Sequence, residues 1–251
     1  TRSLIVTGVQ TCALPISLNV MQDVSVIIRD GELIGKGTGI ALDIAATYGT
    51  ILEGVDVTNF YEGVHLRFCL MASVRNSLAT NIRNESYVAD RGNWVGAGLT
   101  NCQSNSTRFE QCRAFSYAGA KSAFSAYDAS GIIWEQCISE GGNTQYGWFF
   151  DGMDSPVVKD GLIHMGHSEN TPSVAHVKTS IADGVFQVDG LFHQYAGVVL
   201  DANSSSGYPH FLVRNIPYMV TGSTFKSNGT GTIYSFDEMP SAWNALSTSN
   251  W

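Results

Sequence analysis

Length, composition and charge limit the classes of protein to which this sequence can belong. The chain has 251 residues, of which 26 are glycine and only 6 are proline, and its formal net charge is −8. A chain of this length can form one all-β domain, and the glycines suit many tight bends. Nucleic acid is excluded as a partner because no basic stripe could displace its counterions, and the negative charge disfavours an anionic membrane surface.

The first segment of the chain, residues 1–16, does not look like part of a protein domain. Its sequence TRSLIVTGVQTCALPI lacks the basic start, long apolar centre and small-residue cleavage site of a signal peptide. It resembles the translation of a common sequencing adapter. We therefore expect residues 1–16 to be an artefact, residues 17–240 to form one domain, and residues 241–251 to be a C-terminal tail or a truncated edge.

The next elements are strands, since no stretch of a dozen residues has the apolar spacing of an amphipathic helix. A β-branched run begins at Val24 and ends at the turn signal Asp30-Gly31. Coils of a repeat are recognisable from Ala41 onward. The segment Asn84–Trp94 breaks the repeat spacing, which predicts an insertion that projects from the domain.

A four-residue phrase recurs through the domain. A typical copy has an apolar residue (once a lysine), a charged residue, an amide or glycine, and a smaller apolar residue, as in Phe109-Glu110-Gln111-Cys112 and Trp134-Glu135-Gln136-Cys137. Further copies begin at Leu52, Val74, Lys159, Val188 and Val213. The last residues of the five copies from Cys112 to Ile216 are separated by 25, 25, 29 and 25 positions. This period predicts a β-solenoid in which one repeat is one turn.

A second landmark in each repeat is an apolar strand that ends in a polar or charged residue. The copies are Gly39–Asp43, Gly63–Arg67, Ala123–Asp128, Gly147–Asp151, Val174–Lys178, Gly197–Asp201 and Thr232–Asp237. Each coil then contains three strands, with a one-residue bend at the amide or glycine. The arrangement resembles the right-handed parallel β-helix of pectate lyases and phage tailspikes, in which Asn or Gly occupies that bend. The repeats predict about eight coils, and the resemblance to tailspikes implies a homotrimer.

Stacking of the coils predicts columns of inward side chains about 4.8 Å apart. We expect one column to contain Phe109, Trp134, Val188 and Val213. A second column should contain Cys112, Cys137, Leu162, Leu191 and Ile216. The cysteines have no metal-finger spacing, and the stacked pair is predicted to be core rather than a disulfide.

The catalytic signatures of polygalacturonases and pectate lyases are missing from the sequence. A looser set of acid and base candidates lies at Asp151, Asp154, His167 and Glu169. Paired carboxylates of this kind could hydrolyse a glycosidic bond, but Asp151 also fits a residue that closes a turn. Trp94, Tyr146 and Trp148 are the aromatic candidates for contact with sugar rings, although Trp148 lies in an apolar run that favours the core.

The charged position before the bend predicts a column of like charges. Glu110, Glu135, Asp160 and Asp189 would stand in consecutive coils and repel one another. Solvation could offset this repulsion, as could a hard cation such as Ca²⁺ or a shared proton. The column is therefore a candidate metal site.

Three functions fit these features. The first is a phage tailspike-like or surface-attached β-helix that binds polysaccharide, in an extracellular or virion-associated setting. The second is a glycoside hydrolase or polysaccharide lyase that acts on a capsule or cell-wall glycan. The third is a structural spacer without a cleft. Fold alone does not choose among them.

Overall fold

A computed structural model describes the chain from Ser25 through most of the repeats. The described residues are 25–94, 98–141, 144–152, 159–168, 175–181, 184–189, 192–193, 211–214, 218–221, 224–225 and 234–237. Residues 1–16 and 241–251 lie outside these ranges. All the regular elements of the described residues are strands, and none of these residues forms a helix long and apolar enough to cross a membrane.

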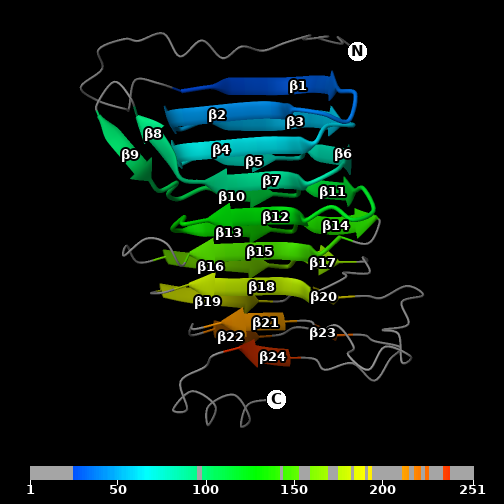
Figure 1. Ribbon diagram of the computed structural model, residues 1–251, viewed down its shortest axis with the longest axis vertical. Helices are drawn as coiled ribbons and strands as arrows, with labels where there is room; N and C mark the ends of the chain where they lie inside the picture. The colour runs from blue at the N-terminus through cyan, green and yellow to red at the C-terminus, as the bar shows by residue number, and fades with distance from the viewer. Residues whose placement is uncertain are drawn as a thin grey trace.

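Eight parallel strands of the described chain form one sheet, which we call the front sheet because it faces the viewer in Figure 1. Its strands follow one another down the axis of the molecule in chain order. They are β2 (Ile40–Tyr48), β4 (Glu62–Leu70), β7 (Glu85–Asp90), β12 (Ser122–Tyr127), β15 (Tyr146–Gly152), β18 (Ala175–Ile181), β21 (Phe211–Arg214) and β24 (Tyr234–Asp237).

The other large sheet of the described residues, the back sheet, has 14 strands in two branches that meet at the continuous strand β3 (Ile51–Thr58). The edge strand β1 (Ile27–Ile34) pairs with β3. The first branch contains β5 (Ser73–Arg75), β10 (Arg108–Glu110), β13 (Ile132–Glu135), β16 (Lys159–His164), β19 (Gly184–Asp189) and β22 (Tyr218–Thr221). The second branch contains β6 (Leu78–Ile82), β11 (Arg113–Ser116), β14 (Ile138–Gly141), β17 (His167–Ser168), β20 (Phe192–His193) and β23 (Thr224–Phe225).

Each turn of the chain passes through a front strand, a first-branch strand and a second-branch strand. In Figure 1 the front strands run to the left and the back strands to the right while the chain descends, which makes the coil right-handed. The fold is therefore the right-handed parallel β-helix with three strands per coil that the repeat predicts. The eight described strands of the front sheet agree with the expected coil count.

Strand register confirms the first predicted column. Phe109 pairs with Trp134, and the column continues through Ile163 to Val188. Val213 is not part of it, because β21 belongs to the front sheet, where Val213 pairs with Thr179. The phrase at Val213 matches the repeat in residue type but lies in a different strand of the coil.

One copy of the phrase is out of register by several residues. Strand β16 continues to His164, so Leu162 pairs with Ile133 in the first branch instead of stacking on Cys137. The bend follows at Met165, whose φ is 52°, and not at Gly161. An insertion within this coil, and not a later one, produces the longer spacing.

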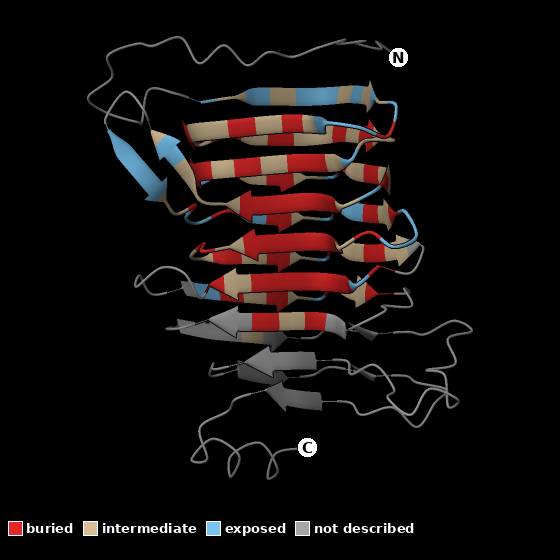
Figure 2. Ribbon diagram, viewed as in Figure 1, coloured by how far each residue is buried: buried red, intermediate tan, exposed pale blue. Residues whose placement is uncertain are grey.

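Side chains from both sheets fill the interior of the solenoid, and Figure 2 shows the burial concentrated in the middle coils. Tyr87, Phe124 and Trp148 form a continuous aromatic stack from consecutive front strands, with ring centroids 5.3 and 5.7 Å apart. Cys112 and Cys137 are fully buried free thiols, which confirms their predicted place in the core. The large buried area of such rings is a major source of stability.

The predicted insertion at Asn84–Trp94 begins too early. Residues Glu85–Asp90 form the regular front strand β7, which pairs in parallel with β4 in the coil above and β12 in the coil below. The projecting element is the antiparallel hairpin of β8 (Gly92–Trp94) and β9 (Leu99–Cys102). Figure 1 shows it beside the upper coils.

Candidate functional site

The bend between the two branches of the back sheet places polar side chains in one column. Asn76, Gln111 and Gln136 occupy the bend in successive coils, with φ angles of 51°, 52° and 50°. Gly54 occupies the same position one coil earlier, with a φ of 61°. Each bend N–H donates to the next coil, as Gln111 does to the Glu135 carbonyl at 2.9 Å. The left-handed backbone therefore repeats, and the amides stack along the axis.

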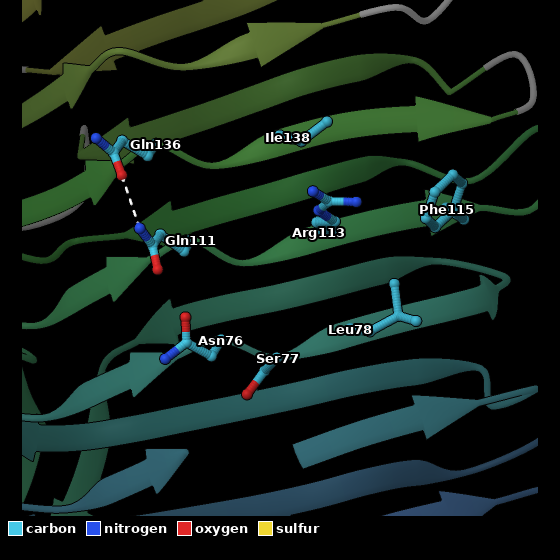
Figure 3. Close-up of a pocket in the computed structure, with 8 residues that line it drawn as sticks. All are labelled: Asn76, Ser77, Leu78, Gln111, Arg113, Phe115, Gln136 and Ile138. Carbon is cyan, nitrogen blue, oxygen red and sulfur yellow. Dashed lines mark hydrogen bonds between the residues drawn. The ribbon is translucent and has the colours of Figure 1, made fainter. Parts of the chain in front are cut away.

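The stacked amides form one wall of a groove of about 580 Å³, which we call the amide groove (Figure 3). All three amide residues are exposed. The Nε2 of Gln111 donates to the Oε1 of Gln136 at 2.9 Å. Since an amide has two N–H donors and a carbonyl acceptor, this one bond leaves donors and acceptors on both residues available to a ligand.

The rest of the amide groove comes from the second branch. Leu78, Arg113 and Ile138 stand in register on β6, β11 and β14, and Phe115 follows two residues after Arg113 on the same face. Figure 3 shows the amides on one side, Phe115 on the other, and Arg113 between them. Apolar surface and a cation thus face the hydrogen-bonding wall.

A second depression, the acidic hollow, lies on the outer side of the front sheet and encloses about 330 Å³. Strands of four consecutive coils and the turns that follow them contribute its lining. The lining residues are Glu62, His65, Glu85, Asp90, Arg91, Tyr127, Asp128 and Asp151.

His65 connects two carboxylates in the acidic hollow. Its Nδ1 lies 3.1 Å from Glu62 Oε2, and its Nε2 lies 3.3 Å from Asp90 Oδ2. Burial alone would lower the pKa of His65, but the hydrogen bonds and charges of Asp90 and Glu62 raise the pKa to about 9. The bond from His65 holds the pKa of Glu62 below its usual value, against the effect of burial. At neutral pH the imidazole is therefore a cation between two carboxylates.

The buried carboxylate of Glu85 is held by hydroxyl groups from the next coil. Its Oε1 accepts from Ser125 Oγ at 2.6 Å and from the hydroxyl of Tyr127, and Lys121 Nζ lies 3.5 Å away. Burial, followed by the charge of Glu85, raises the pKa of Tyr127, so that its proton stays available for donation. Asp128 forms an ion pair with Arg91, whose Nη1 lies 2.9 Å from Asp128 Oδ2.

An aromatic cluster adjoins the acidic hollow on the same face of the front sheet. It consists of Tyr127, Tyr146 and Phe149. The ammonium of Lys121 lies 4.5 Å from the ring centres of Tyr127 and Phe149, and Lys178 lies 5.2 Å from that of Phe149. The cations and rings cover one another, which explains why this outward-facing cluster is largely buried.

Of the four predicted catalytic residues, the structure describes Asp151 and His167, and it does not bring these two together. Asp151 lies in the acidic hollow, opposite Tyr127 in the register of the front sheet. His167 lies on β17 in the back sheet, opposite Ile138. Asp154 and Glu169 lie outside the described residues. The structure therefore places one predicted carboxylate among other acidic groups and separates it from the histidine.

The three predicted carbohydrate-binding aromatics have different surroundings. For Trp148 the core position that its apolar run favours is confirmed and the sugar-binding role is wrong, because its side chain has no exposed surface and stacks on Phe124 inside the solenoid. Tyr146 is 8% exposed and borders the acidic hollow through the aromatic cluster. Trp94 is half-buried at the end of β8. Contact of Tyr146 or Trp94 with a glycan stays a prediction.

The predicted column of four carboxylates is also corrected by the register. Glu110 and Glu135 pair, but the next position is His164, which in turn pairs with Asp189. Asp160 lies near the start of β16, where its Oδ1 accepts from Ser130 Oγ at 2.9 Å and from the Gly131 N–H at 2.6 Å. The carboxylate of Asp160 thus binds a turn of the preceding coil.

Arginine offsets the charges that remain in this column. Arg108 contacts both Glu110 and Glu135. His164 Nδ1 lies 3.6 Å from Glu135 Oε1. Within the described ranges, no group of three or more His, Cys, Asp or Glu side chains is placed to hold a metal ion. The guanidinium of Arg108 therefore offsets the repulsion between Glu110 and Glu135, which was one reason to expect a Ca²⁺ site.

Sequence reasoning missed most residues of both depressions. The acidic hollow draws on Glu62, His65, Glu85 and Asp90, which are separated along the chain and meet only through the stacking of coils. The amides were recognised as bends but not as a surface. The signal for the amide groove was the match of Gln111 with Gln136, followed two and four residues later by outward-facing side chains.

Comparisons with known proteins find similarity at the level of structure. No protein-family model matches the sequence, and no curated protein matches it. Among solved structures, the tailspike gp42 of Acinetobacter phage vb_AbaP_AS12 has a TM-score of 0.43 and 13% sequence identity, and the match covers 85% of this chain and 46% of the tailspike chain. The chain thus spans less than half the length of that tailspike, and at this identity the likeness concerns the fold alone.

Proposed function

We propose that this chain is a tailspike-like β-helix that binds polysaccharide in the amide groove. The observation that carries the proposal is the exposed, in-register pair Gln111 and Gln136, with Phe115 on the opposite side of the groove. Sugar hydroxyls need paired donors and acceptors, which amides supply. The C–H faces of sugar rings pack on aromatic and aliphatic side chains. A linear polymer also suits a groove whose contacts repeat along the solenoid axis.

The proposed setting is extracellular or virion-associated, with polysaccharide as the partner and a homotrimer as the assembly. Neither nucleic acid nor a membrane is part of the proposal, since the net charge is −8. Light scattering tests the assembly. A trimer would have three times the chain mass of 27.1 kDa.

The double substitution Gln111→Gly and Gln136→Gly tests the amide groove. It removes both amides but introduces residues that tolerate the left-handed bend, as Gly54 does at the same position two coils before Gln111. We expect the affinity for the glycan to fall about tenfold or more, since two or more hydrogen bonds are lost, while the melting temperature changes little. A glycan array identifies the ligand, and calorimetric titration measures the affinity.

The control for this experiment is Asn101→Gly in the hairpin, a change of the same kind at a φ of 54°. It should leave glycan affinity unchanged. Unaltered binding in the double variant would contradict the proposed groove. Absence of binding to any glycan by the wild-type protein would favour the structural spacer.

Hydrolysis or lyase cleavage at the acidic hollow is the second candidate function. It is favoured because Asp151 and the buried carboxylate of Glu85 line the same hollow, which an aromatic cluster adjoins. If the hollow cleaves glycans, incubation with the bound polysaccharide should release reducing ends, and Asp151→Asn should lower the rate about 100-fold or more. Asp30→Asn is the control, because Asp30 is exposed in the first described strand and does not line the hollow. Binding without release of sugar excludes this candidate.

A further inference from the structure

We propose that the ligand of the amide groove is an acidic heteropolysaccharide with sparse negative charge, and that Arg113 pairs with its carboxylate. This inference rests on the proposed function and specifies its ligand class. Arg113 lies in the middle of the groove, between the amide wall and Phe115 (Figure 3).

The surroundings of Arg113 differ from those of the other arginines whose side chains the structure describes. Those arginines contact carboxylates or, for Arg83, the ring of Tyr117, and the carboxylate-paired ones are Arg29, Arg67, Arg75, Arg91 and Arg108. Within the described residues the exposed guanidinium of Arg113 has no ion pair and no ring contact. Its backbone is fixed, because its N–H donates to the Ser77 carbonyl and its carbonyl accepts from Tyr87.

A carboxylate is the group that this guanidinium would recognise best. Arginine presents a planar fork of N–H donors that binds the two oxygens of a carboxylate, and such charge-assisted bonds are stronger than bonds to a hydroxyl. Amide donors of Gln111 or Gln136 could bind hydroxyls of the neighbouring sugar in the same chain. The groove thus offers one charged contact and several neutral ones.

The number of charges in the groove indicates how densely the ligand is charged. Arg113 is the one cation among the eight residues that line the groove, and the other seven are neutral. A polymer with a carboxylate on every sugar would place further negative charges against Leu78 and Ile138, which offer no partner. The net charge of −8 would repel such a polymer as well. A polymer that alternates acidic and neutral sugars avoids both costs.

Three probes of equal length separate these ligand classes. They are an oligosaccharide of alternating glucuronate and N-acetylglucosamine, the same oligosaccharide with its carboxylates reduced to alcohols, and oligogalacturonate. We expect the wild-type protein to bind the first about tenfold more tightly than either of the others. Arg113→Gln should abolish the preference over the reduced form, whereas Arg29→Gln, in the first described strand, should preserve it.

Several outcomes would overturn the inference. Equal binding of the first two probes by the wild type would do so. A preference of the wild type for oligogalacturonate would also do so. A preference for the alternating probe that persists in Arg113→Gln would do so as well. An equal loss for both probes in Arg113→Gln would assign the residue a structural role instead. If all three probes bind alike and the variant with both Gln111→Gly and Gln136→Gly loses that binding, the proposed function stands and this inference fails. If the double variant binds as the wild type does, the proposed function itself fails.

Discussion

Replacing Trp148 with alanine is expected to lower the free energy of unfolding by about 3–5 kcal/mol, the range for deletion of a large buried aromatic side chain. Trp148 is fully buried, and its ring stacks on Phe124 at a centroid distance of 5.7 Å. Its loss leaves a cavity between coils that pack only on their neighbours, so the surrounding rings cannot easily close it. Urea denaturation followed by circular dichroism measures the change.

Two further variants make this expectation specific. Trp148→Phe keeps a ring in the stack and should cost less than half as much as the alanine variant. Trp94→Ala, in the hairpin, should cost less again because Trp94 is only half-buried. A loss below about 1 kcal/mol in Trp148→Ala would show that the aromatic stack does not stabilise the solenoid.

Raising the pH from 6.5 to above 9 is expected to destabilise the protein by about 3 kcal/mol through His65. Its pKa is about 9 in the folded protein, against an ordinary value of 6.5. Protonation of His65 therefore stabilises the fold fully below pH 6.5, and this contribution is lost as the pH rises through 9. The pKa of Glu62 is shifted the other way, so its contribution is present above its ordinary value of 4.5 and is lost on acidification.

Denaturation at pH 6 and at pH 9.5 measures this contribution. His65→Gln should be less stable than the wild type at pH 6. Its free energy of unfolding should change much less between pH 6 and pH 9.5 than that of the wild type. His164→Gln is the control, since the His164 side chain is 40% exposed and contacts one carboxylate, that of Glu135, at 3.6 Å. A wild-type pH dependence that persists in His65→Gln would assign the effect to other groups.

The fold could be predicted because the solenoid repeats local rules in every coil. The bends at Gln111 and Gln136 and the column of Phe109 and Trp134 follow from residue types at fixed spacing. The prediction was wrong where composition imitated the repeat. The segment Lys159–Leu162 has the right residue types, but β16 extends to His164, and only pairing with the neighbouring coil determines that register.

The candidate sites were less accessible to prediction from sequence. Asp151 was grouped with acidic residues that are close in sequence, whereas Glu62 and Glu85, which line the same hollow, belong to coils far away in the sequence. Trp148 was offered as a binding residue because an aromatic side chain looks the same in sequence whether it points inward or outward. Ladders of side chains are a property of stacked coils, so the site emerges only when the register of several coils is known.

The hairpin of β8 and β9 leaves the solenoid and returns to it at almost the same point. Ser104 Oγ donates to the Asp90 carbonyl at 2.7 Å and accepts from the Cys69 N–H at 3.0 Å, and Asn105 then resumes the ladder opposite Leu70. The two ends of the excursion are thus tied together by the coils themselves, so that lengthening the segment between them costs only a slowly growing closure entropy. This corner, which also carries Asp90 and Arg91 of the acidic hollow, can accept a grafted loop of another length and sequence while the coils keep their stacking.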